Sequence, residues 1–168
     1  HFVSAGFTYE RLGDFDSALR LYKQDKFDFG VEKILRNQGK IEELVKYWRE
    51  TGNTSRLATH FEDNDPEQAA GFYQELNDYR KASGCLARAG KPVEAIKLLV
   101  DKKLYEDALR IRENIMDTNG LDEARLNASM TRCYQELAPR YEVSDPERAL
   151  GFYCKLDDQE GIRRVAIP

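Results

Sequence analysis

Three cysteines and two histidines are the side chains of this chain that could most readily support catalysis or metal binding. Cys85, Cys133 and Cys154 lie far apart in the sequence, and no Cys-x-x-Cys pair brings two of them together. His1 and His60 are the two histidines that could join them as metal ligands. Because zinc sites need closely spaced ligands of this kind, we expect no metal site. We interpret the cysteines as small core or surface thiols in a reducing, cytoplasmic compartment.

An acidic stretch at residues 62–67 could be taken for a calcium-binding loop. A loop that began at Asp63 would need glycine at position 68 and glutamate at position 74, and glutamine occupies both. We therefore interpret the stretch as a turn in which Asp65 caps the following helix and suits its dipole.

His60 would need a nearby nucleophile and an orienting acid to act as a catalytic base. Cys85 is the nearest candidate nucleophile in the repeat pattern described below, and nothing else supports such a pair. The glycine-rich phosphate loops and the sequence motifs of hydrolases and metalloproteases are absent. The sequence therefore predicts no catalytic residue, no cofactor and no enzyme activity.

Composition excludes several further classes of protein. The 168 residues include 26 Lys and Arg against 30 Asp and Glu, which gives a net charge of −4. This mildly acidic balance argues against a general nucleic-acid binder. The hydrophobic share of 41% is too high for a disordered chain. No apolar run approaches the length of a membrane span, so we expect no membrane insertion.

An internal repeat is the most informative feature of the sequence. The segment Asp65–Tyr73 matches Asp145–Tyr153 at seven of nine positions. A finer period of 13 residues connects small or apolar residues, which we call the anchors, with one step of 12 and one interruption. The anchors are Ala18, Val31, Leu44, Leu57, Ala69, Ala82, Ala95, Ala108, Ala149 and Ile162.

Apolar residues three and four positions after nearly every anchor define one face of an α-helix. His60 and Arg112 are the two exceptions at these positions. Five positions before the anchors, Gly or Asn recurs and can adopt the left-handed conformation that ends a helix. Each 13-residue unit is therefore predicted to be one short helix and a tight turn, and two units make a hairpin with a period near 26 residues. Hairpins of this kind bury their apolar faces by stacking.

The register is interrupted between Ala108 and Ala149, which are 41 residues apart. Within residues 104–143 we predict an irregular pair of longer helices, one from Leu104 to Asp117 and one from Leu121 to about Leu137, ended or kinked by Pro139. The pair could flank a groove or form a dimer contact, or it could be a tolerated irregularity. Elsewhere, the aromatic residues that recur in register are expected mainly to pack between hairpins, and the hydroxyl groups of Tyr73 and Tyr153 could in addition reach a groove and contact a partner.

The first hairpin resembles a tetratricopeptide repeat, in which small residues let two helices approach and Gly-Asp forms the turn. The residues that carry this resemblance are Ala5, Tyr9, Gly13, Asp14, Phe15, Ala18 and Tyr22. The period near 26 departs from the 34 residues of that family. The short hairpins, such as Gly90–Leu99, resemble the helical solenoids of intraflagellar-transport subunits and of clathrin-like coat proteins.

This resemblance covers residues 1–112 and 145–168 and implies an all-α, tetratricopeptide-like solenoid of about six short hairpins. We expect residues 1–168 to form a single solenoid segment, part of a larger protein. The expected function is a non-catalytic scaffold that binds other protein subunits, with membrane trafficking or a vesicle coat as the more specific expectation. The alternative is a sensor, oligomerisation or peptide-binding arm of a multi-domain regulatory protein. Self-association is a further expectation.

Overall fold

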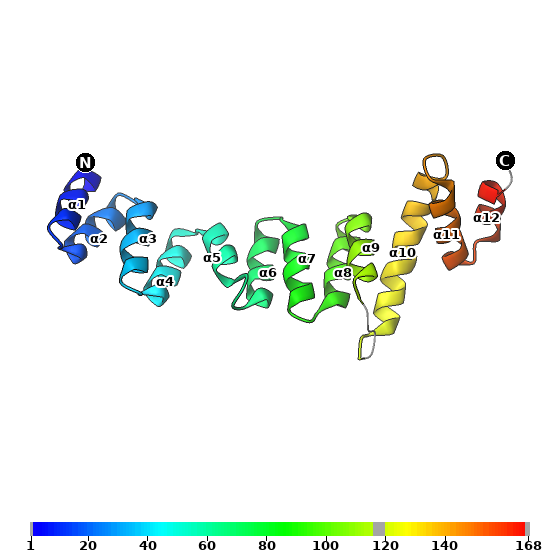
Figure 1. The fold of residues 1–168 in the computed structure, drawn as a ribbon, viewed down its shortest axis with the longest axis horizontal. Helices are drawn as coiled ribbons and strands as arrows, with labels where there is room; N and C mark the ends of the chain where they lie inside the picture. Colours follow the sequence, from blue (N-terminus) through cyan, green and yellow to red (C-terminus); the bar gives the residue numbers. More distant parts are fainter. Residues whose placement is uncertain (1, 116–119, 167–168) are drawn as a thin grey trace. The chain divides into compact units, whose positions relative to one another are not determined.

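A computed structural model describes residues 2–115 and 120–166. Within these ranges the chain forms twelve α-helices and no strand, and it has the α-α superhelical repeat fold that the periodicity predicts (Figure 1). The helices are α1 (Phe2–Arg11), α2 (Phe15–Gln24), α3 (Asp28–Asn37), α4 (Ile41–Thr51), α5 (Thr54–Phe61), α6 (Pro66–Glu75), α7 (Tyr79–Arg88), α8 (Pro92–Asp101), α9 (Tyr105–Glu113), α10 (Glu123–Tyr141), α11 (Pro146–Leu156) and α12 (Gln159–Ala166).

The chain divides into two compact units, residues 1–57 and 58–168, and the division falls inside α5. Within each unit, successive helices pack against one another, as α1 packs on α2 and α10 on α11. None of the described helices combines the length and the apolar character needed to cross a bilayer.

Each anchor occupies the same position in its helix. The amide of every anchor donates a hydrogen bond to the carbonyl of the residue that precedes the helix, as Ala18 does to Asp14 at 3.1 Å and Ala149 to Asp145 at 3.0 Å. Nine of the ten anchors are buried, and Ile162 is half-buried against the core of residues 58–168. The 13-residue period is therefore the number of residues from the first turn of one helix to the first turn of the next.

The turns before the anchors adopt the left-handed conformation at most of the predicted positions. Positive φ occurs five residues before the anchor at four glycines and also at residues with a side chain. These residues are Gly13, Gly39, Gly52, Gly90, Lys26, Asn77, Lys103 and Asp157. Asn64 and Ser144 are the exceptions, and both precede an Asp-Pro pair.

The two Asp-Pro segments share one conformation, as their sequence identity predicts. Asp65 and Asp145 have φ values of −146° and −152°, and each side chain accepts a hydrogen bond from the amide three residues later. In both segments Pro is the first helical residue, where it removes no intrahelical hydrogen bond.

The irregular segment differs from the prediction in its details. Helix α9 ends at Glu113 and has 9 residues, so it is not longer than its neighbours. Asp117, the predicted end of that helix, lies outside the described residues. Helix α10 is long, with 19 residues, and continues through Pro139 to Tyr141. Because Pro139 and Gln135 are both exposed, water can satisfy the carbonyl that lacks the proline N–H.

Candidate interaction surfaces

His60 and the three cysteines first considered for chemistry lie on four different helices, α5, α7, α10 and α11. Within the described ranges, no three His, Cys, Asp or Glu side chains come together as metal ligands. Cys85 and Cys133 are buried and Cys154 is exposed, all as free thiols. Burial raises the pKa of the Cys133 thiol to about 11, which disfavours the thiolate. His60 is half-buried, and its ring lies edge-on to that of Phe61 at 5.0 Å.

A repeated polar arrangement, which we call the tyrosine–carboxylate cluster, joins three consecutive helices. In each cluster a tyrosine hydroxyl donates a hydrogen bond to a carboxylate, which belongs to the preceding helix or to the turn that follows that helix. A nitrogen donor contacts the same carboxylate and belongs to the following helix or to the turn that begins it. The first cluster shows the geometry: Tyr22 donates to Glu10 at 2.9 Å, and the Lys33 ammonium lies 2.5 Å from the other Glu10 oxygen.

Four further clusters repeat this order along the chain. Their members are Asp28, Tyr47 and Asn53; Glu62, Tyr73 and Arg88; Glu106, Tyr141 and Arg148; and Glu142, Tyr153 and Arg164. The clusters of Glu62 and Glu142 belong to the two Asp-Pro segments, and their members occupy equivalent positions when these segments are aligned. Each pairs a carboxylate three residues before the Asp-Pro pair with a tyrosine seven residues after its proline.

The clusters shift the pKa values of their members in a consistent direction. Burial, together with the hydrogen bond to Glu10, raises the pKa of Tyr22 to about 12. The hydrogen bond from Lys33 holds the pKa of Glu10 below its usual value, and the hydrogen bond from Tyr153 does the same for Glu142. Both shifts favour a protonated phenol beside an ionised carboxylate, which is the state that the geometry requires.

Tyr73 and Tyr153, which we predicted to contact a partner, lie inside two of these clusters. Their side chains are 4% and 3% exposed, and their hydroxyl groups donate to Glu62 and Glu142. The observed role of both residues is to pack and bond within the stack. Contact with a partner stays a prediction that their position does not favour.

Three helical glycines, Gly6, Gly30 and Gly161, give the cluster tyrosines room. A Cβ atom at Gly30 would lie 2.5 Å from Tyr22 Cδ2, and one at Gly161 would lie 2.5 Å from Tyr153 Cε1. All three glycines are helical and buried, so their role is close approach rather than a turn.

An apolar surface lies on a different side of α1 from Gly6, Phe7 and Glu10, which contact residues of α2 and α3. The residues of this surface are spaced by three and four, which places them on one face of the helix, and the first residue of α2 extends it. We call it the α1 outer surface; its members are Phe2, Ala5, Tyr9, Leu12 and Phe15, all exposed, with Leu12 at 76%.

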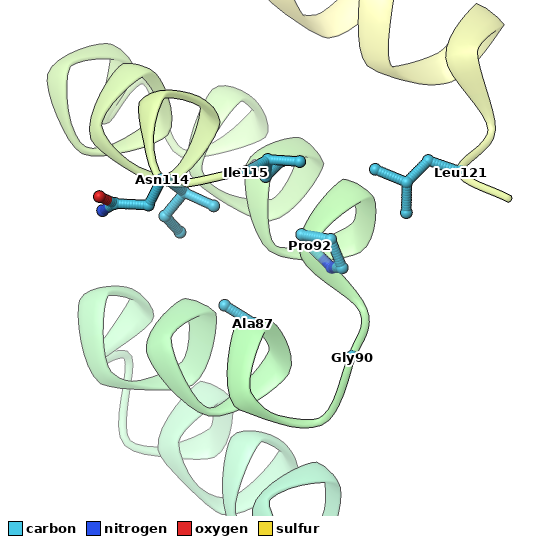
Figure 2. Close-up of a pocket in the computed structure, with 7 residues that line it drawn as sticks. Ala87, Gly90, Pro92, Asn114, Ile115 and Leu121 are labelled. Atoms are coloured by element: carbon cyan, nitrogen blue, oxygen red, sulfur yellow. The ribbon is translucent and has the colours of Figure 1, made fainter. Parts of the chain in front are cut away.

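A cavity of about 390 Å³ lies at the interruption of the repeat (Figure 2). Ala87 of α7, Gly90 and Pro92 at the start of α8, and Ile111, Asn114 and Ile115 at the end of α9 line it, with Leu121 before α10. The side chains of Ile115 and Leu121 face each other across it in Figure 2. All seven lining residues are uncharged, so their side chains give this cavity no preference for a positively or negatively charged ligand.

A second depression of about 330 Å³, which we call the α9–α11 groove, is formed by α9, α10 and α11. Its lining residues are Leu109, Arg112, Glu113, Tyr134, Phe152 and Lys155. The rings of Tyr134 and Phe152 stack with centroids 5.5 Å apart, and the Lys155 ammonium lies 4.9 Å from the Tyr134 ring. The groove therefore combines an aromatic floor with two cations.

Sequence reasoning identified some of these features and missed others. Arg112 was already visible as a charged residue at a position that is usually apolar. The cluster carboxylates were missed, although the alignment of the two Asp-Pro segments contains a signal for two of them: Glu62 and Glu142 occupy equivalent positions. The α1 outer surface was missed because Phe2 and Leu12 fit the apolar pattern of any packed helix.

Comparisons with known proteins do not narrow the identity of the chain. No protein-family model, no curated protein and no solved structure matches it.

Proposed function

We propose that this chain is a non-catalytic interaction scaffold that binds other protein subunits. The observation that carries the proposal is the α1 outer surface, because α1 presents apolar side chains on both of its sides. A helix of this kind is stable in water when both sides are covered, and exposed apolar patches of this kind mark sites of protein association. Among the described residues, Tyr9 is 39% exposed and Leu12 is 76% exposed on this side of α1.

The more specific proposal is a role in membrane trafficking, as part of an intraflagellar-transport or coat-like assembly. It rests on the resemblance of the short hairpins to the solenoids of those assemblies, and a fold of this type serves many functions. The repeated stack supports the general role, since each added hairpin extends a continuous surface.

The test uses a double substitution, Tyr9→Ser with Leu12→Ser, in the full-length protein. We expect its partner proteins to be lost when the tagged protein is purified from its own cells, and the loss to be reproduced with the purified partner. Val143→Ser is the matched control, because Val143 is an isolated exposed apolar residue in a turn. Equal partner recovery by the double variant and the control would contradict the proposal.

One observation favours the alternative function, a peptide-binding arm of a multi-domain regulatory protein. The α9–α11 groove places two cations beside an aromatic floor, which suits a segment that carries an acidic side chain next to an apolar one.

A further inference from the structure

Arg112 occupies a position in its helix where the repeat places a buried apolar residue. The equivalent position holds Tyr22, Leu35, Trp48, Leu86 and Leu99 in other helices, all buried. Arg112 is half-buried, and within the described residues no hydrogen bond or ion pair joins its guanidinium. A cation that no described carboxylate neutralises is available to an anionic group bound from outside the chain.

Tyr134 is also half-buried, whereas Lys155 is exposed and lies over the Tyr134 ring. The Tyr134 hydroxyl accepts and donates no hydrogen bond among the described residues, and Lys155 forms no ion pair there. Glu113, the carboxylate at the rim, is exposed and lies beyond ion-pair distance of both cations. The groove therefore contains three unused donors around an apolar floor formed by Leu109 and Phe152.

The tyrosine–carboxylate clusters show what completes such a set of groups. Four of the five clusters surround one carboxylate with a tyrosine hydroxyl and a Lys or Arg, as Glu106 is held by Tyr141 and Arg148 at 2.5 Å and 3.0 Å. The α9–α11 groove has the tyrosine and the cations, and its one acidic lining residue, Glu113, is exposed and pairs with neither cation among the described residues. Charge complementarity and this internal precedent indicate the same missing group.

We propose that the α9–α11 groove binds an acidic peptide segment, in which a side-chain carboxylate meets Arg112, Tyr134 and Lys155. An apolar side chain beside that carboxylate covers Leu109 and Phe152. The proposal deepens the peptide-binding alternative and does not depend on the α1 outer surface.

The test measures the binding of short synthetic peptides to the full chain by nuclear magnetic resonance titration. The probe is a blocked pentapeptide with two glutamates on each side of a phenylalanine, and its neutral counterpart has glutamine at the four flanking positions. We expect saturable binding of the acidic peptide, with shifts at residues around Tyr134 and Phe152, and weakening as salt is raised. The neutral peptide should bind at least several-fold more weakly.

Three variants test the assignment of the individual groups. Arg112→Met, Lys155→Met and Tyr134→Phe should each weaken binding by about two- to tenfold, and each keeps the bulk of the side chain it replaces. Lys97→Met, at an exposed lysine of α8, is the matched control and should bind as the unmodified chain does. Glu113→Gln should tighten binding, since it removes a competing carboxylate.

Two results would overturn the proposal. The first is equal binding of the acidic and neutral peptides, including no binding of either. The second is unchanged peptide binding by a combined Arg112→Met and Lys155→Met variant that keeps its melting temperature. Either result would leave the scaffold role untouched, because the Tyr9 and Leu12 variant tests that role at a different surface in the other unit.

Discussion

The Tyr22 hydroxyl of α2 donates a 2.9 Å hydrogen bond to Glu10 of α1, and Glu10 in turn accepts from Lys33 of α3. This relationship joins a fully buried tyrosine to a carboxylate 12 residues earlier in the chain, on the neighbouring helix. Because the ring also fills the space left by Gly30, packing and hydrogen bonding constrain the same side chain.

Removal of the Tyr22 hydroxyl should destabilise the fold while leaving the ring in place. Tyr22→Phe leaves the Glu10 carboxylate with one donor fewer in a partly buried site, and we expect a loss of about 1–2 kcal/mol in the free energy of unfolding. Urea denaturation measures this loss. The control is Tyr9→Phe, at an exposed tyrosine whose substitution should change the free energy by less than about 0.5 kcal/mol. Equal values for the two variants would show that the cluster is not stabilising.

Acid should weaken the clusters through their carboxylates. The hydrogen bond from Lys33 holds the pKa of Glu10 below its usual value of 4.5, so the folded state favours ionised Glu10. The resulting stabilisation is present above pH 4.5 and disappears as the pH falls through the lower pKa of the folded state. We expect Glu10→Gln to be less stable than the unmodified chain at neutral pH and to approach it in acid. A constant difference across that range would refute this linkage.

Alkali should weaken the clusters through their tyrosines. Burial and the carboxylate partner raise the pKa of Tyr22 to about 12, and the pKa values of Tyr47, Tyr73, Tyr141 and Tyr153 are also raised. A raised pKa stabilises the fold below pH 10 and this contribution is lost as the pH rises toward the folded value. Absorbance titration of the nine tyrosines should therefore show five phenols that ionise late in the folded chain and normally in denaturant.

The anchors should not tolerate added volume. Ala95 is fully buried, so Ala95→Leu forces neighbouring side chains apart and should cost about 1–3 kcal/mol. Ala128→Leu, at an exposed alanine in α10, provides the comparison and should be nearly neutral. Thermal unfolding monitored by circular dichroism measures both, and similar melting temperatures would contradict the assignment of Ala95 as an anchor.

Glycines at turns and in helices should respond in opposite directions. Gly90 has a φ of +76°, so Gly90→Val should strain the turn by about 1–2 kcal/mol. Gly71 lies inside α6 with open space around it, and Gly71→Ala should stabilise the helix by about 0.5–1 kcal/mol. Chemical denaturation of the two variants checks the signs, and a stable Gly90→Val protein would rule out the left-handed turn.

The sequence predicted the helices well where local rules decide the structure. The 13-residue register correctly predicted the first turn of ten helices, because burial of one face of each helix imposes a regular spacing of apolar residues. It missed the eleventh, at Leu126, which is buried and bonds to the Asp122 carbonyl at 3.0 Å. Leu126 lies 18 residues after Ala108, so a search at a fixed spacing passes over it.

The polar contacts were beyond sequence reasoning for a different reason. Glu106 and Arg148 are 42 residues apart and meet because α9 and α11 both pack on α10. Nothing local to either residue indicates this pairing. Arg112 was identified by its unusual position, but only the structure shows that Tyr134 and Lys155 lie with it around one groove.

The clusters also set a limit on how this chain can be divided. A single hairpin contains a carboxylate and a tyrosine, but the third member belongs to the next helix along the chain or to the turn that begins that helix. The smallest fragment that closes one cluster therefore has three helices, and neighbouring fragments overlap except between α7 and α9, where α8 belongs to no cluster. Trimming the chain by one hairpin removes contacts from helices that remain. Truncation should therefore lower the free energy of unfolding by more than the deleted residues contribute. Fragments intended for separate study should begin and end outside these overlapping groups of three helices.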